Sequence, residues 1–288
     1  METLFGLNEF NIYKDNQSTT LHHDYEYSYK LPFEKVHDKV GWTRLFQTYW
    51  GHSITVSIVY YIAIRVIQSI MRNREAFVLQ RPLFFWNFGL ALFSIAGFVR
   101  FAEDFFVAWY NNGLEYSLCH SCNPDGVAAF WSLAFAISKI VELGDTLFIV
   151  LRKKPLIFLH YYHHAAVLVY TVHSGAEHTA PGQAFITMNY FAHAFMYSYY
   201  AYCALGKRLP KWVSMCVTSI QTTQMFLGVA VTCFVYYLKV YKNVPCQQSM
   251  ANLYLAFLIY ITFAVLFVEF FVNAYLKKQE RREKKKLQ

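Results

Sequence analysis

Long apolar segments alternate with short polar connectors along most of the 288-residue chain. Crossing the hydrocarbon core of a bilayer takes about 20 predominantly apolar residues in a helix. We predict transmembrane helices in the seven segments that approach or exceed that length, residues 53–71, 82–99, 127–151, 156–172, 184–205, 212–238 and 251–276. The pattern therefore predicts an all-α polytopic membrane protein. Its transmembrane domain spans 53–276, between an amino-terminal segment (1–52) and a basic tail (277–288).

The composition agrees with a membrane protein, since 56% of the residues are hydrophobic and 19% are aromatic. One soluble core of this length needs far less apolar surface. The formal charge of +8 could point to nucleic acid, but the Lys and Arg residues lie in short clusters between the apolar segments and in the tail. That distribution is typical of membrane topology, so we expect the lipid bilayer, and no nucleic acid, as a partner.

Basic residues gather on alternate connectors, which sets the expected orientation. Clusters at 72–81, 152–154 and 207–211, together with the tail, all fall on one side of the predicted bundle. Lys and Arg that flank membrane helices stay on the cytoplasmic side. Seven helices then place the amino terminus in the lumen and the carboxyl terminus in the cytosol.

The predicted luminal side carries features of an oxidising, glycosylating compartment. Asn16 begins the only glycosylation sequon in the chain, and Cys119, Cys122 and Cys246 lie in luminal connectors, where disulfides persist. We predict a disulfide between Cys119 and Cys246. The run from Cys119 to Cys122 could also be half of a zinc site, but no second ligand pair follows at the usual spacing, so we expect no metal.

Ionisable side chains inside the predicted helices need an explanation, because charges in the bilayer are unfavourable. The third helix spaces its polar residues three or four apart on one face: Lys139, Glu142, Asp145 and Thr146. They form either an ion pair that fixes helix packing or part of a functional site.

The next three predicted helices carry polar stripes of their own. In the fourth, His160, His163 and His164 share one arc of the helix, which favours a catalytic or metal-binding cluster over a structural one. The fifth repeats polar residues at steps of three and four, Asn189, His193, Met196, Tyr197 and Tyr200. The sixth carries Gln221 and Gln224, for which amide bonding between helices is the alternative.

Depth in the membrane joins these stripes. We count depth at 1.5 Å per residue from the predicted cytosolic ends of the helices. A depth of roughly 8 to 20 Å is shared by Glu142, His160, His163, His164, His193, Tyr197 and Gln221. Separate packing features have no reason to coincide in depth. We therefore predict one pocket that opens to the cytosol.

The residue types in this pocket suit acyl transfer. Imidazoles serve as nucleophile or base, and amides and hydroxyls stabilise a tetrahedral oxyanion. Basic residues at its expected mouth suit the phosphates of coenzyme A, although topology explains them equally well: Arg152, Lys153, Lys154, Lys207 and Arg208.

Four sequence motifs carry a resemblance to a known family. They are KIVELGDT from Lys139, HYYHH from His160, HAFMYSYY from His193 and TSIQTTQ from Thr218. In this order they resemble the ELO family, the very-long-chain fatty acid elongases of the endoplasmic reticulum. The resemblance extends from about the first predicted helix to the tail.

The resemblance implies a 3-ketoacyl-CoA synthase, which condenses malonyl-CoA with an acyl-CoA and needs no cofactor or metal. It implies seven helices, six of them around an acyl-chain tunnel. By transfer, His163 takes the acyl group as an acyl-imidazole, His160 and His164 orient or deprotonate it, and His193 assists the malonyl step. The remaining polar residues would line the coenzyme A and thioester region, namely Lys139, Glu142, Asp145, Thr146, Asn189, Met196, Tyr197, Tyr200, Gln221 and Gln224.

The resemblance also implies a cellular setting. Lys285 and Lys286 resemble a dilysine retrieval signal of the endoplasmic reticulum. Expected partners are the ketoacyl reductase, the dehydratase and the enoyl reductase of the elongation cycle, and a homodimer is left open. The run from Arg152 before His160 is similar to family members that extend saturated and monounsaturated chains, although elongases of polyunsaturated chains carry nearly the same run.

Two other classes compete with this interpretation. A membrane di-iron desaturase or hydroxylase also uses HxxHH pairs, but it needs more His residues than the four at the right depth here. A seven-helix receptor or transporter would share the outside amino terminus, but the predicted ionisable pocket faces the cytosol.

Overall fold

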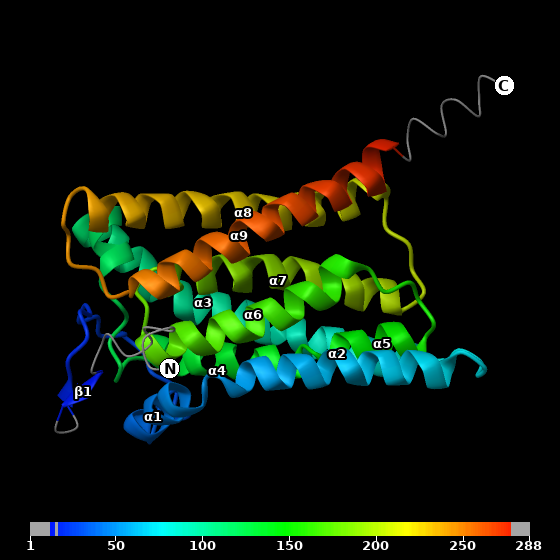
Figure 1. The fold of residues 1–288 in the computed structure, drawn as a ribbon, viewed down its shortest axis with the longest axis horizontal. Helices are drawn as coiled ribbons and strands as arrows, with labels where there is room; N and C mark the ends of the chain where they lie inside the picture. Colours follow the sequence, from blue (N-terminus) through cyan, green and yellow to red (C-terminus); the bar gives the residue numbers. More distant parts are fainter. Residues whose placement is uncertain (1–11, 15–16, 278–288) are drawn as a thin grey trace.

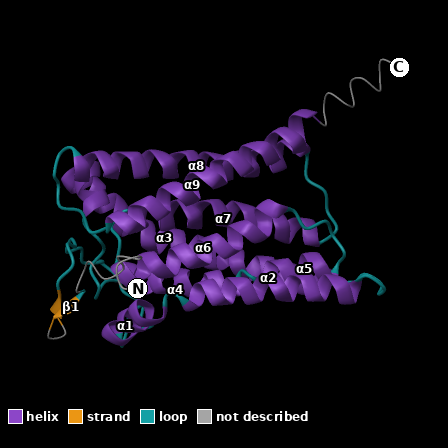
Figure 2. Cartoon of the chain, in the orientation of Figure 1, coloured by secondary structure: helices purple, strands orange, loops and turns teal. Residues whose placement is uncertain are grey.

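Helices that run roughly side by side make up most of the computed structural model, which describes residues 12–14 and 17–277 (Figures 1 and 2). The main helices are α2 (His52–Met71), α3 (Gln80–Cys119), α4 (Val127–Val141), α5 (Gly144–Leu151), α6 (Phe158–Glu177), α7 (Gly182–Ala204), α8 (Lys211–Val240) and α9 (Met250–Phe271), and α9 continues into a π-helix, η1 (Val272–Leu276). Asn16, Lys285 and Lys286 lie outside the described residues, so the sequon and the retrieval signal stay predictions.

Four helical segments of the described chain are long and apolar enough to cross a membrane, α2, α3, α8 and the run of α9 and η1. The predicted segments 156–172 and 184–205 also form helices, α6 and α7, but their polar stripes lower their hydropathy. The chain is thus a multi-pass membrane protein with an all-helical membrane domain. The full count of seven spans stays a prediction.

The predicted helix over 127–151 is not continuous, which corrects that expectation. It forms α4 and α5, joined by a tight turn in which Asp145 N–H bonds Glu142 O at 3.0 Å and Thr146 N–H bonds Leu143 O at 3.3 Å. Gly144 allows the close approach of Trp86 at this turn, since a Cβ there would lie 2.7 Å from the indole. The turn therefore depends on the absence of a side chain at Gly144.

Helix α3 extends twenty residues beyond the predicted end at Val99. Its extension carries Arg100, Glu103 and Asp104, which are too polar for the bilayer but compatible with a helix. A kink at Gly113, with φ of 87°, bends its last turns. Hydropathy located the end of the apolar segment but not the end of the helix.

Six of the helices close a ring by their contacts. Helix α3 contacts α4, α4 contacts α6, α6 contacts α9, α9 contacts α8, α8 contacts α7, and α7 returns to α3. Helix α2 lies outside this ring and packs on α5 and α6 (Figure 1). The interior of the ring is where cavities and polar side chains occur.

The two ends of the bundle differ. Helix α1 (Lys39–Tyr49) and the short strands β1 (Tyr13–Lys14) and β2 (Gln17–Ser18) lie at one end, with the connectors α3–α4, α6–α7 and α8–α9 (Figure 1). We call this the capped end. The other, the basic end, carries the connectors with the Arg and Lys clusters. Asp38 begins α1 by accepting from Gly41 N at 2.8 Å, a cap that the sequence analysis did not use.

Covalent and ionic contacts hold the capped end together. Cys119 and Cys246 form the predicted disulfide, which ties the end of α3 to the α8–α9 connector. The buried carboxylate of Glu34 accepts from Arg100 Nε at 2.8 Å and from Trp131 Nε1 at 2.7 Å. Burial alone would raise the pKa of Glu34, but these hydrogen bonds hold it at about 2. The amino-terminal segment is therefore firmly docked on α3 and α4.

Candidate active site

The histidine motif opens α6 at the basic end. Pro155 and the extended backbone of Ile157 delay the helix until Phe158, so His160, His163 and His164 occupy its first two turns. All three histidines line a cavity of about 510 Å³, which we call the histidine cavity. The remaining wall comes from α3, α5, α7, α8, α9 and the 152–157 connector.

Most residues of the predicted pocket meet around this cavity. Its lining includes Asp145, Arg152, His160, His163, His164, Asn189, His193, Met196, Tyr197, Tyr200, Gln221 and Gln224. Lys139, Glu142 and Thr146 lie one layer further out and contact the lining. The side chains on helices of opposite direction thus reach one level, as depth counting predicted.

A buried ion pair supports one wall of the histidine cavity. Lys139 Nζ lies 2.8 Å from Glu142 Oε1 and donates to Asn189 Oδ1 at 2.9 Å. His193 Nδ1 lies 3.8 Å from Glu142 Oε2. The pair therefore joins α4 to α7, as the packing alternative expects, and also lies beside His193, which lines the histidine cavity.

Asp145 forms a second cluster next to the first, since its partner Tyr197 and His193 are neighbours on α7 with ring centroids 5.2 Å apart. It accepts from Trp86 Nε1 at 2.6 Å and from Tyr197 Oη at 2.7 Å. His164 Nε2 lies 3.9 Å from the same carboxylate. Donors from α3 and α7 thus fix the carboxylate beside the histidine helix.

His160 is oriented by a chain of hydroxyl groups. Its Nε2 lies 2.9 Å from Thr146 Oγ1, which in turn lies 2.5 Å from the phenol oxygen of Tyr60. The rings of His160 and His164 pack edge to face, with centroids 4.5 Å apart. The hydroxyl chain reaches α2, the helix outside the ring.

His163 has apolar neighbours instead of polar partners. Its ring centroid lies 4.7 Å from that of Phe263 on α9. Its Nδ1 is buried, with no hydrogen-bond partner within the described part of the chain. A ring nitrogen without a partner keeps its lone pair or its proton free for a ligand.

The residues of the other motifs lie at the edge of the cavity. Gln221 Nε2 lies 3.0 Å from Met196 Sδ, while Gln224 is buried and Tyr200 is half exposed at 46%. Of the two glutamines on α8, Gln224 is therefore the better placed for direct contact with a ligand.

The basic residues divide into two groups. Arg152 and Lys154 line the histidine cavity, but Lys153, Lys207 and Arg208 do not. Lys153 Nζ instead donates to the carbonyl of Arg74 at 2.8 Å, and Lys207 lies 5.6 Å from the Tyr202 ring. Lys153 thus stabilises the connector between α2 and α3 by this hydrogen bond.

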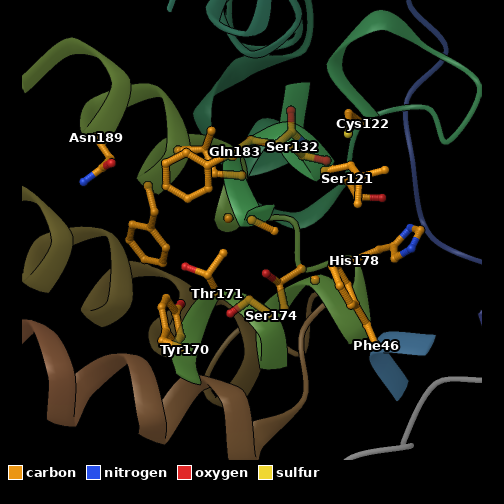
Figure 3. A pocket seen from close by; sticks show the side chains of 18 of the residues that line it. Phe46, Ser121, Cys122, Ser132, Tyr170, Thr171, Ser174, His178, Gln183 and Asn189 are labelled. Atoms are coloured by element: carbon orange, nitrogen blue, oxygen red, sulfur yellow. The ribbon is translucent and has the colours of Figure 1, made fainter. Parts of the chain in front are cut away.

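A second, narrower cavity of about 160 Å³ runs from the histidines toward the capped end. We call it the narrow cavity. The two cavities share His163, Asn189, Gln224 and Met225 in their walls. In Figure 3 Asn189 lies on one side of this cavity and His178 and Phe46 on the other. His163 therefore stands where the two cavities meet.

Side chains that could hold a metal do not converge in the described ranges 12–14 and 17–277. No three His, Cys, Asp or Glu residues there form a group suited to a metal ion.

Two contributors to the site were missed by the sequence analysis, Trp86 and Tyr60. Each lies in an apolar segment where an aromatic residue is ordinary. One indirect indication of them lies in the sequence. Asp145 and Thr146 are polar residues in a membrane helix, so each needs a hydrogen-bond partner from a neighbouring helix.

Known proteins resemble the chain over nearly its whole length. Residues 45–283 match the sequence model of a family described as ELO, the GNS1/SUR4 family. A Caenorhabditis elegans protein named putative fatty acid elongase 4 is 60% identical over 278 residues, which cover 96% of this chain and 95% of the relative. Human very long chain fatty acid elongase 3 is 39% identical over 241 residues, covering 83% and 88%. Mouse very long chain fatty acid elongase 6 is 38% identical over 260 residues, covering 90% and 96%.

Proposed function

The chain belongs to the ELO (GNS1/SUR4) family, and from this premise we propose that it is a very-long-chain 3-oxoacyl-CoA synthase. The proposed reaction condenses a long-chain acyl-CoA with malonyl-CoA to give 3-ketoacyl-CoA, carbon dioxide and free coenzyme A. The junction of the two cavities at His163 supports it, because a thioester there has room for an acyl chain on one side and for coenzyme A on the other.

In the first proposed half-reaction, a ring nitrogen of His163 attacks the thioester carbonyl. The carbon–sulfur bond breaks, and the coenzyme A thiolate takes the proton of the other ring nitrogen and leaves as a thiol. The product is an acyl-imidazole. The unpartnered Nδ1 of His163 supports this role, since a nucleophile must have a free lone pair.

His160 and His164 flank His163 on α6 and would position its ring. The ring centroids of His163 and His164 are 5.8 Å apart. Asp145 faces His164, and Thr146 holds His160. These contacts support a positioning role, in which fixed polar groups keep the reacting ring in one geometry.

In the second proposed half-reaction, malonyl-CoA loses carbon dioxide and its enolate carbon attacks the acyl carbon. The bond to His163 breaks, and the released imidazolate takes up one proton from water to restore the neutral imidazole. His193 and Asn189 lie on the wall that would face the enolate oxygen, as donors that stabilise a developing negative charge, and Lys139 holds Asn189 from behind this wall.

The proposed substrate position follows from the cavities. The acyl chain would enter the narrow cavity, whose walls near His163 are largely apolar, and coenzyme A would lie at the basic end beside Arg152 and Lys154. Saturated and monounsaturated chains are the proposed substrates, and polyunsaturated chains are the alternative.

The proposed setting is the endoplasmic reticulum membrane, with the capped end in the lumen and the basic end in the cytosol. The disulfide at the capped end supports this orientation, because the lumen is oxidising. The reductases and the dehydratase of the elongation cycle are the proposed partners at the cytosolic face.

The observation that carries the proposal is His163 at the junction of the two cavities. Its test is an elongation assay in microsomes with labelled malonyl-CoA and a panel of saturated, monounsaturated and polyunsaturated acyl-CoAs, comparing wild type with His163→Ala. We expect two-carbon extension by the wild type alone. Extension by the variant would refute the role of His163, and no extension by the wild type would refute the function.

A further inference from the structure

The far end of the narrow cavity is polar, although an acyl chain ends in a methyl group. Ser132 on α4, Thr171 and Ser174 on α6 and Gln183 on α7 all line this part, and Figure 3 shows them around the same hollow. A purely apolar chain would leave these groups facing hydrocarbon, which is unfavourable.

Gln183 has an acceptor that the chain does not satisfy. The residue is only 3% exposed, and its Nε2 donates to the carbonyl of His120 at 2.7 Å. Its Oε1 is buried and has no hydrogen-bond partner among the described residues. Because Nε2 is already engaged, the side chain cannot reverse its amide without losing that bond. The position therefore calls for a donor from a ligand.

The neighbouring hydroxyls offer both acceptors and donors, and the Tyr170 hydroxyl on the same wall is buried without a partner among the described residues. Ser132 Oγ donates its proton to Ala129 O at 3.0 Å, so its lone pairs are what remains for a ligand. Ser174 Oγ accepts from Asn252 Nδ2 at 3.0 Å, so its proton remains available to a ligand. The group that fits best is therefore one that donates to Gln183 Oε1 and can also accept, as a hydroxyl does.

Charge at this end is balanced, which excludes an ionic ligand. Lys39 lines the narrow cavity, but its ammonium pairs with Asp125 at 2.5 Å. His178 is held by Thr43 Oγ1 at 2.9 Å from Nε2. A terminal carboxylate would bring only acceptors and a charge without a partner, whereas a hydroxyl brings a donor and stays neutral.

The polar end lies at the depth that a long acyl chain reaches. Thr171 and Ser174 follow His163 by eight and eleven residues on α6, which corresponds to about 12 and about 17 Å along the helix axis. Helix α1 packs over this end with Trp42 and Phe46, both of which line the cavity. The terminal carbon of a bound chain would thus lie in the closed end of the cavity, next to Gln183 and Ser132.

We propose that this cavity end is a subsite for a hydroxyl group at or near the terminal carbon of the acyl chain, and that the hydroxyl donates to Gln183 Oε1. The inference rests on the proposed function and names a substrate class for the same site, the ω-hydroxylated long-chain acyl-CoAs. No bond is made or broken at this subsite.

The test is a competition assay with full-length protein in microsomes. Labelled malonyl-CoA is supplied with equal amounts of an unsubstituted acyl-CoA and its ω-hydroxy counterpart, in a series from dodecanoyl to octadecanoyl. The ratio of extended products gives the ratio of kcat/KM for the two chains. Gln183→Leu removes the acceptor at similar volume. Thr187→Val is the matched control, because Thr187 is also buried on α7 with an unpartnered hydroxyl but does not line the cavity.

We expect the wild type to extend the ω-hydroxy chain at least as well as the unsubstituted chain for one member of the series. Gln183→Leu should lower the product ratio about tenfold, the effect of one lost hydrogen bond, and Thr187→Val should leave it unchanged. A wild type that prefers the unsubstituted chain at every length overturns the subsite, whether or not the variant folds. An equal ratio in wild type and Gln183→Leu also overturns it. Failure to extend either chain overturns the proposed function instead, and the subsite with it.

Discussion

Thr146 Oγ1 lies 2.9 Å from Nε2 of His160, which links the turn between α4 and α5 to the histidine helix. Tyr60 reaches the same hydroxyl from α2. One imidazole of the cluster is therefore held by residues of two other helices, so its orientation depends on packing outside the ring as well as within it.

Removing the hydroxyl of Thr146 should affect turnover more than binding. In Thr146→Val the ring of His160 loses its partner while the side-chain shape is kept. We expect kcat to fall about tenfold with little change in the KM for acyl-CoA, because the lost hydrogen bond orients a ring without contacting the acyl chain. Tyr60→Phe keeps the bond to His160 and should cost less. A Thr146→Val variant with normal kcat would contradict this role.

A side chain at Gly144 should disturb the turn between α4 and α5. The added methyl of Gly144→Ala would lie 2.7 Å from Trp86, whose indole must then leave Asp145. We expect about 1–3 kcal/mol of destabilisation by thermal unfolding in detergent, together with reduced elongation. Gly89→Ala on α3 is the control, because nothing lies within 4 Å of a Cβ there. Equal effects of the two substitutions would show that the contact with Trp86 is unimportant.

The buried pair of Lys139 and Glu142 should behave as a unit. Lys139→Met leaves a buried carboxylate without its partner, and we expect a loss of about 3–5 kcal/mol in unfolding free energy. The double variant with Glu142→Met should recover part of that loss, since it removes both charges. Thermal unfolding of the single and double variants measures the coupling. Strictly additive losses would mean that the pair contributes no interaction energy.

The length of the product should depend on α1. Phe46 closes the narrow cavity against Gly175, where a Cβ would lie 3.1 Å from the Phe46 ring. Phe46→Ala opens this end, so we expect elongation to continue to longer chains than in the wild type, measured by chromatography of the products. Leu45→Ala, at a residue 47% exposed on the same helix, should not change the distribution. Unchanged products from Phe46→Ala would place the end of the acyl chain elsewhere.

Acid should weaken the docking of the amino-terminal segment. The hydrogen bonds of Glu34 lower its pKa from 4.5 to about 2 in the folded chain. Its contribution to stability is therefore complete above pH 4.5 and is lost as the pH falls toward 2, where the folded carboxylate is protonated as well. Unfolding temperatures across that range should fall more steeply for wild type than for Glu34→Gln. Parallel curves would contradict the assignment.

The sequence predicted the level at which the polar residues meet, because helical rise and the ends of apolar segments are local properties. It could not identify the partners of Asp145 and Thr146. Trp86 and Tyr60 lie in apolar segments where any aromatic residue would be expected, and only the order of helices around the ring makes them neighbours.

Two elements of the fold could not be predicted from the hydropathy pattern. Helix α1 is short and divides its residues evenly between polar and apolar ones, so hydropathy did not distinguish it from a loop, although Asp38 gave a start signal. The turn at Gly144 divides a segment that is long enough for one membrane helix, and Trp86 from another helix packs against Gly144 at this turn. Contacts between distant parts of the chain decided both features.

We propose that His163 carries the acyl group between the two half-reactions. The most direct measurement is mass spectrometry of the purified protein after incubation with acyl-CoA in the absence of malonyl-CoA. We predict the added mass of one acyl group, mapped to the peptide that contains His163, and its loss when malonyl-CoA is added. Acylation of another residue, or extension of the chain by His163→Ala at the wild-type rate, would contradict the account.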